Sequence, residues 1–97
     1  MNTSQARRFL RRIDDGVRFH FINGHSAGTM DELVQGIESL HDKEYDHHVY
    51  FDHNDFSNWL IDIIGDNDLA LRIYNLERAL CIINIKKRIV ELEKYAR

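Results

Sequence analysis

The chain contains no proline and a single cysteine, Cys81, among its 97 residues. One cysteine excludes an internal disulfide, and because Cys81 lies among apolar residues we expect it to be a small buried hydrophobe. No apolar run approaches the roughly 18 residues of a membrane span, and no basic segment followed by an apolar run opens the chain. We therefore expect a soluble protein of the reducing cytoplasm, with no membrane as a partner.

Lysine and arginine are almost absent from the middle of the chain. Residues 31–68 hold one lysine against eleven acids, whereas residues 1–30 hold five arginines against two acids and residues 69–97 hold seven bases against three acids. We expect the basic ends to lie against the acidic middle, within one chain or across a dimer. The acidic middle would repel phosphates, which disfavours nucleic acid as a partner and a helix-turn-helix around Gly65.

The length allows one domain with one core, spanning residues 1–97. Apolar residues spaced at i, i+3, i+4 and i+7 indicate helices, and this spacing predicts four of them, at about residues 4–14, 29–41, 55–64 and 66–95. The fold class is therefore mainly α, with a long C-terminal helix. The arginines of the first helix are expected to form a solvated face, and they are Arg7, Arg8, Arg11 and Arg12.

Local signals mark where these helices begin and end. Residues 29–32, Thr-Met-Asp-Glu, have the form of a capping box. Asn54 or Asp55 is expected to cap the third helix, and Gly65 to end it in the left-handed conformation. Asp66 then caps the last helix at once.

Strand signals are few. Val17, Phe19 and Phe21 alternate with polar residues and stop at a turn dipeptide, Asn-Gly, which predicts a short half-buried strand. Residues 42–54 suit either a second strand, around Val49 and Phe51, or a helical turn. We expect at most a two-stranded ribbon that pairs residues 17–22 with 47–52.

Residues 47–73 resemble a small domain of unknown function found mainly in archaeal proteins. The matching residues are a histidine in HHVYF, then Asp55, Phe56, Trp59, Leu60, Gly65, Asp66, Leu69 and Ala70. The resemblance implies a fold signature and no established activity. Trp59 is also predicted to anchor the core, because its neighbours Phe56 and Ile63 are apolar.

The letters GHSAG at residues 24–28 match the G-x-S-x-G pattern of a hydrolase nucleophile elbow. Such an elbow follows a central strand of a large parallel sheet, whereas only one strand-like segment precedes Ser26. The capping box also begins the helix too late for Ser26 to lie on a strained strand-to-helix turn. We expect Ser26 in a solvated loop and no catalytic residue, with anion binding by the loop amides as an alternative.

Histidines and aspartates gather between residues 41 and 55, and imidazole with carboxylate suits zinc or another transition metal. The candidate ligands are His47, His48, Asp52 and His53. Their spacing matches no known ligand motif, and adjacent side chains in a strand point in opposite directions. We therefore expect surface and core histidines, and no cofactor.

The predicted final helix of about 27 residues would be about 40 Å long, against a diameter of about 32 Å for a globule of this length. Its second half carries an apolar stripe with a spacing of 3, 4, 3 and 4, made of Ile82, Ile85, Ile89, Leu92 and Ala96. We expect this stripe to join two copies in a homodimer, although the first helix of the same chain could cover it instead. The predicted function is a non-enzymatic protein-interaction or assembly module with an unknown protein partner. The alternative is a metal- or small-anion-binding protein.

Overall fold

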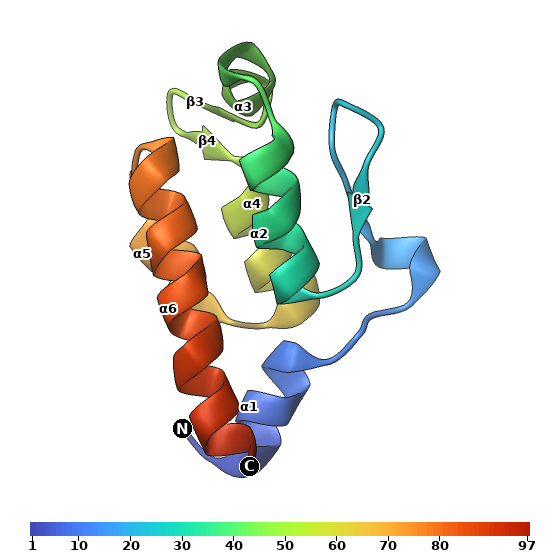
Figure 1. The fold of residues 1–97 in the computed structure, drawn as a ribbon, viewed down its shortest axis with the longest axis vertical. Coiled ribbons are helices and arrows are strands. Elements are labelled where there is room, and N and C mark those ends of the chain that lie inside the picture. The colour runs from blue at the N-terminus through green and yellow to red at the C-terminus, as the bar shows by residue number, and fades with distance from the viewer.

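A computed structural model describes all 97 residues as six α-helices and two short β-hairpins (Figure 1). The helices are α1 (Thr3–Leu10), α2 (Met30–Ser39), α3 (Asp42–His48), α4 (Asp55–Trp59), α5 (Asn67–Ile73) and α6 (Arg78–Ala96). The strands are β1 (Phe19–His20), β2 (Ser26–Ala27), β3 (Val49–Tyr50) and β4 (His53–Asn54). The predicted mainly α class with a long C-terminal helix is confirmed, and no helix combines the length and apolarity needed to cross a bilayer.

The predicted N-cap side chains are in place, but the capping box predicted at residues 29–32 is only half formed, because Glu32 accepts the Gly28 N–H. The side chains of Thr29, Asn54 and Asp66 each accept a hydrogen bond from the backbone N–H three residues further on, at 3.0 to 3.2 Å. These bonds satisfy amides that a helix N-terminus leaves free. After α4 the chain continues for one π-helical turn, η2 (Leu60–Ile64), and Gly65 ends it with a left-handed φ of 92°.

The predicted helix over residues 66–95 is wrong in one respect, because it is two helices. The chain turns between α5 and α6, where the Leu76 N–H donates to the Ile73 carbonyl at 3.1 Å. Asn75, a residue type that favours turns, lies in this connection. An unbroken helix would measure about 40 Å, and the longest dimension of the whole molecule is 38 Å. The turn lets α5 bury its own apolar face in the core.

The predicted ribbon between residues 17–22 and 47–52 does not form. Instead β1 pairs with β2 and β3 pairs with β4, each antiparallel, and Phe19 lies opposite Ala27. Most of the ambiguous segment is helical, as α3, before it enters the second hairpin. Pairing within a hairpin closes a much shorter loop than pairing across α2, and Gly24 supplies the left-handed turn residue that the first hairpin needs.

An aromatic cluster forms the centre of the core. Phe56 is completely buried, and its ring centroid lies 5.1 to 6.2 Å from those of the rings around it, which belong to Phe19, Phe21, Tyr45 and His48. Trp59 is buried as predicted, but it lies at the edge of this cluster. Its indole N–H donates to the Val17 carbonyl at 2.9 Å, which holds the 3₁₀ turn η1 (Asp15–Val17) on the core.

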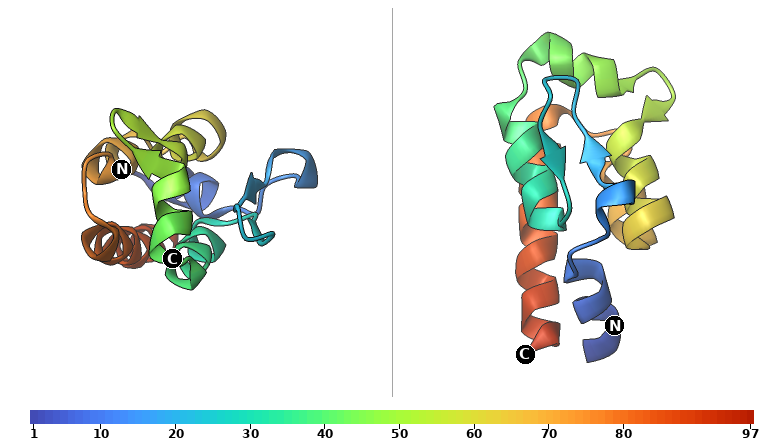
Figure 2. Two further views of the ribbon diagram at one scale, coloured as in Figure 1. Left: turned by 90° about the horizontal axis from the view of Figure 1, so that it is seen from above. Right: turned by 90° about the vertical axis from the view of Figure 1, so that its right-hand side faces the viewer.

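Helix α6 is the longest element and runs along one side of the molecule (Figure 2). Helix α2 lies beside its N-terminal half and α1 beside its C-terminal end, so that the two chain termini are neighbours. The Phe21 ring packs against α2 at Gly36, where any β-carbon would overlap the ring.

Candidate interaction surface

The apolar stripe predicted as an interface lies on the inner face of α6. Ile85 and Leu92 are completely buried, and the other three residues of the stripe are partly buried against the same core, namely Ile82, Ile89 and Ala96. Helices α1 and α2 cover this face. Ile85 and Leu92 are therefore not available to a second copy, and the interface prediction needs correction: the stripe packs within the chain.

The arginines of α1 do not oppose this packing, because several of them bind acceptors in the same chain. The Arg7 guanidinium donates to the Ala96 carbonyl at 3.2 Å, at the end of α6. The chain leaves the helical conformation at Arg11, earlier than predicted, and the Arg11 guanidinium donates to the Ile63 carbonyl at 3.0 Å. Helix C-terminal carbonyls carry a partial negative charge that attracts such cations. The predicted solvated face is thus partly used in packing.

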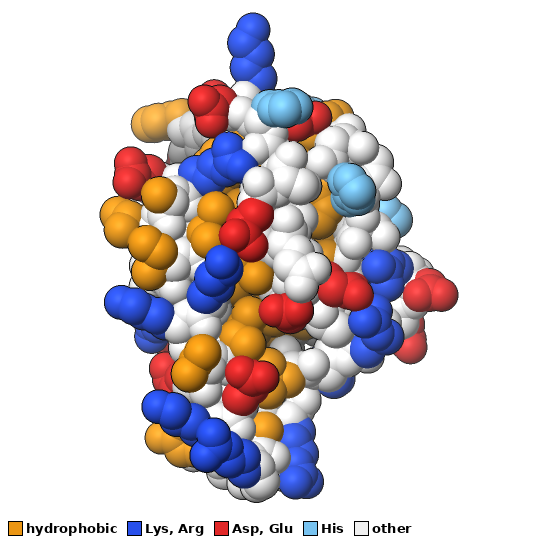
Figure 3. Space-filling view, in the orientation of Figure 1, with side chains coloured by type: hydrophobic (Ala, Val, Ile, Leu, Met, Phe, Trp, Pro, Cys, Tyr) orange, Lys and Arg blue, Asp and Glu red, His pale blue; other side chains and the backbone are white.

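A second stripe runs along the outer face of α6 and its approach. On the helix it steps by three and four residues through Leu80, Ile83, Lys87, Val90 and Lys94, and the partly buried Leu76 precedes it in the turn before α6. Leu80, Ile83 and Val90 expose 44, 46 and 53 % of their surface. Figure 3 shows hydrophobic side chains gathered at the upper left, over the N-terminal half of α6, and basic side chains towards the lower end. Helices α1 and α2 pack on the opposite face, and of the stripe only Val90 borders the hollow between α2 and α6.

The tip of the β3–β4 hairpin presents the most exposed large hydrophobic side chain, Phe51, at 96 %. Its two-residue turn consists of Phe51 and Asp52, and only Asp52 has a left-handed φ, of 56°. Aspartate is one of the few residues other than glycine that enter this region, at some cost in strain. The Tyr50 ring stacks on the His53 ring with centroids 4.4 Å apart, and Tyr74 donates to Asp52 at 3.4 Å. The tip therefore holds Phe51 out from the surface.

The hairpin tip and the outer stripe are continuous. A hollow of about 340 Å³ lies between the hairpin and the turn that joins α5 to α6, and Tyr50, Phe51 and Leu76 are among the residues that line it. Leu76 also precedes the stripe in the turn before α6. We call the combined patch the outer surface, and it consists of Tyr50, Phe51, Leu76, Leu80, Ile83 and Val90.

Of the four candidate metal ligands only His48 and His53 come together, and they meet at the carboxylate of Asp55. His48 is buried, and both of its ring nitrogens are engaged: Nε2 accepts from the Ile22 N–H at 3.0 Å, so Nδ1 carries the proton and donates to Asp55 at 3.0 Å. His53 bonds the other oxygen of Asp55 at 2.5 Å. His47 is exposed on α3 and Asp52 lies at the hairpin tip. No group of three His, Cys, Asp or Glu side chains is placed to hold a metal ion.

The GHSAG segment forms the second arm of the first hairpin, not the predicted solvated loop. Ser26 lies in β2, its hydroxyl accepts from Arg18 Nε at 3.0 Å, and α2 begins only at Met30. This geometry lacks a nucleophile elbow, because the strand does not turn directly into the helix.

An internal carboxylate occupies the place where the loop amides were expected to bind an anion. Glu32 accepts the Gly28 N–H at 2.8 Å and pairs with the Arg12 guanidinium at 2.8 Å. The hydrogen bond from Arg12, followed by that from Gly28, lowers the pKa of Glu32 to about 2. The Gly28 N–H is therefore already taken and a carboxylate lies beside the loop, which disfavours the anion-binding alternative.

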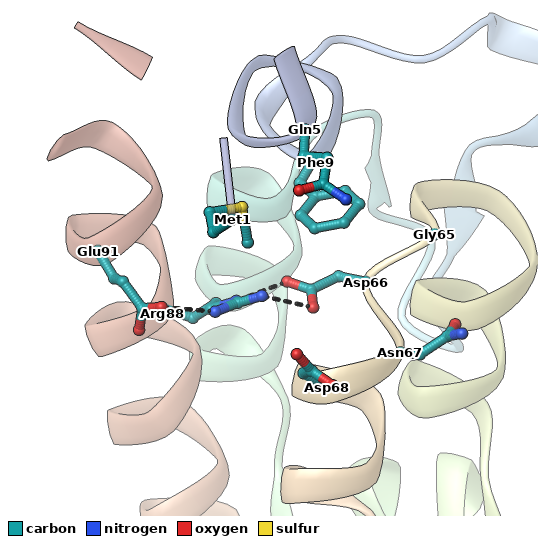
Figure 4. Close-up of a pocket in the computed structure, with 9 residues that line it drawn as sticks. All are labelled: Met1, Gln5, Phe9, Gly65, Asp66, Asn67, Asp68, Arg88 and Glu91. Carbon is teal, nitrogen blue, oxygen red and sulfur yellow. Dashed lines mark hydrogen bonds and ion pairs between the residues drawn. The ribbon is translucent and has the colours of Figure 1, made fainter. Parts of the chain in front are cut away.

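A buried ion pair ties α5 to the inner face of α6 (Figure 4). Arg88 and Asp66 are exposed by only 3 and 1 %, and the guanidinium donates to both carboxylate oxygens, at 2.8 and 3.0 Å. Arg88 also donates to Glu91 at 2.7 Å, and hydrogen bonding to Asp66 raises the pKa of Arg88. A hollow of about 300 Å³ lies over the pair. Because the two buried side chains hydrogen-bond each other, we infer that the pair holds α5 in place on α6.

Sequence reasoning missed both the ion pair and the outer surface. The signal for Arg88 was its position three residues after Ile85 and four before Leu92, which puts it on the inner face. Phe51 was expected in a second strand, whereas it lies in a hairpin turn. The signal for the outer stripe was the spacing of Leu80, Ile83 and Val90.

Comparisons with family models, with curated proteins and with solved structures found no match to this chain. The resemblance to a domain of archaeal proteins accordingly stays an expectation from the sequence.

Proposed function

We propose that the chain is a non-enzymatic protein-interaction module that assembles as a homodimer through the outer surface. The observation that carries the proposal is Phe51, an aromatic side chain almost fully exposed on a constrained hairpin and continuous with an apolar helix stripe. Contiguous exposed apolar patches mark interaction sites in soluble proteins. Aromatic side chains held in one place are frequent anchors of such interfaces.

The other exposed hydrophobic side chains do not form a comparable patch, which supports the outer surface as the interface. The other exposed large hydrophobic side chains lie on separate elements or near the chain ends, and they are Met1, Val17, Ile22, Ile61, Leu71 and Tyr95. Single exposed hydrophobic residues are normal on protein surfaces. Only the outer surface combines several of them with a continuous course along one helix.

The test is the mass of the protein in solution, measured by light scattering on the wild type, Ile83→Asp and Leu71→Asp. We expect two chains for the wild type and for Leu71→Asp, because Leu71 is more exposed than Ile83 but lies on α5, outside the outer surface. Ile83→Asp should have the mass of one chain. A symmetric dimer would bury two unpaired carboxylates, one from each copy, and this cost opposes association. Circular dichroism checks that each variant is folded.

A wild-type mass of 11.5 kDa at all concentrations would overturn the proposal. So would a dimer that Ile83→Asp leaves intact, because the contact would then lie elsewhere.

A further inference from the structure

We infer that the second copy packs antiparallel on α6, about a two-fold axis that crosses the helix between residues 81 and 82, with Phe51 of each copy against Val90 of the other. This inference rests on the proposed function. It adds the orientation of the two copies and the contacts that each side chain makes.

The charges on the outer stripe favour an antiparallel arrangement. The stripe is apolar at its start, at Leu80 and Ile83, and carries Lys87 and Lys94 towards its end, while Glu77 lies at the helix start. A parallel in-register pair of helices would place Lys87 against Lys87 and Lys94 against Lys94. Like charges directly opposite each other are destabilising. An antiparallel pair instead brings Lys87 of one copy to Glu77 of the other, while Arg78 beside Glu77 is paired with Asp42 of its own chain.

The spacing of the stripe then fixes the register. An axis between residues 81 and 82 places Leu80 of one copy opposite Ile83 of the other, and the same contact recurs on the other side of the axis. It also places Leu76 opposite Lys87, whose aliphatic stem can cover the leucine while its ammonium group reaches Glu77. Lys87 has no ion-pair partner within its own chain, whereas its neighbour Lys86 binds Glu38 at 3.0 Å.

The same register brings the hairpin tip into the contact. Val90 lies about 13 Å along the helix from the proposed axis, at 1.5 Å per residue. The position that faces it lies beyond the start of α6 in the other copy, where the hollow shared by Leu76 and Phe51 is found. Phe51 is the side chain that projects there.

The area required also favours including the hairpin. Together with Leu76, the stripe as far as Val90 is about 21 Å long and about 10 Å wide, so its flat area is about 200 Å² per copy. A specific interface buries about 800 Å² of accessible surface per partner. Each exposed aromatic side chain adds about 150 to 250 Å², so Phe51 and Tyr50 supply a large part of the difference. The helix stripe without the hairpin would be too small.

Charge reversal tests the orientation. We would measure the dimer dissociation constant at low salt, by sedimentation equilibrium, for Lys87→Glu, Glu77→Lys and the double variant. Each single change should weaken the dimer by about 5- to 30-fold, since two symmetric ion pairs become repulsive. The double variant should return to within about threefold of the wild type, because the pairs form again with their signs exchanged.

Three features make this result specific. Within one chain, residues 77 and 87 are about 15 Å apart along the helix, so any rescue acts between copies. Glu77→Lys brings the net charge of −3 closer to zero, so an effect of net charge would strengthen the dimer instead. Lys43→Glu, on the exposed part of α3, makes the same charge change as Lys87→Glu and should leave the dimer unchanged.

The possible outcomes separate the inference from the proposed function. A double variant as weak as its two single changes combined, in a protein whose dimer is still broken by Ile83→Asp, would overturn the orientation and leave the interaction module standing. A wild type that is a single chain would overturn both. Phe51→Ser and Val90→Ser should weaken the dimer non-additively, and additive effects would remove Phe51 from its place against Val90.

Discussion

The two faces of α6 carry the same 3–4 spacing of apolar residues but have different surroundings. The inner face is covered by α1, α2 and α5, and its fully or almost fully buried residues are Cys81, Ile85, Arg88 and Leu92. The outer face presents Leu80, Ile83 and Val90 to solvent. An apolar stripe therefore indicates that a helix packs against something, but it does not tell whether the partner belongs to the same chain. On α6 the buried charge of Arg88 marks the inner face, because it meets Asp66.

The largest effect is expected on the inner face, from Asp66→Ala. This change leaves the buried Arg88 guanidinium without its main partner and removes the cap of α5. Breaking a buried pair in this way costs about 3 to 5 kcal/mol of the free energy of unfolding. Urea unfolding in the Ile83→Asp background, where only packing within the chain counts, measures the change.

The matched control for this change is Asp68→Ala, an exposed position in the first turn of the same helix. We expect it to alter the free energy of unfolding by no more than about 0.5 kcal/mol. Equal losses at Asp66 and Asp68 would show that the buried pair does not hold α5 on α6.

A smaller loss is expected from Leu92→Ala, which removes a completely buried side chain between α6 and the core. Such a truncation costs about 2 to 5 kcal/mol, depending on how far the cavity collapses. The same urea titration in the monomeric background gives the value. A loss below about 1 kcal/mol would contradict the assignment of this face to the core.

The smallest effect on folding is expected from Val90→Ala. Val90 lies two residues before Leu92 in the sequence but on the outer face of α6. In the monomeric background it should change the free energy of unfolding by less than about 0.5 kcal/mol. Were Val90→Ala as costly as Leu92→Ala, the two faces would not differ in the way described.

Local features of the fold could be predicted from the sequence because each depends on a few neighbouring residues. The caps at Thr29, Asn54 and Asp66 and the left-handed Gly65 belong to this class. The turn between α5 and α6 could not be predicted, since it contains neither proline nor glycine and follows from packing both helices on one core. The strand pairing was missed because residues 17–22 were expected to pair with a distant segment, whereas each strand pairs with the next one along the chain.

The candidate site was harder to predict for the same reason. The histidine cluster was expected to hold surface and core histidines, but their partner could not be predicted: Asn54 caps α4 and leaves Asp55 free to bind His48 and His53. The inward position of Arg88 makes sense only once Asp66, far away in the sequence, is known to face it. The segment around Phe51 suited a strand or a helical turn, and only the hairpin turn shows that Phe51 is exposed.

The most direct test of the outer surface is the melting temperature measured over a hundredfold range of protein concentration. A dimer is stabilised by mass action, so the melting temperature of the wild type should rise with concentration. That of Ile83→Asp should stay constant, because the variant unfolds from a single chain. A wild-type melting temperature that does not change with concentration, together with the mass of one chain, would contradict the account.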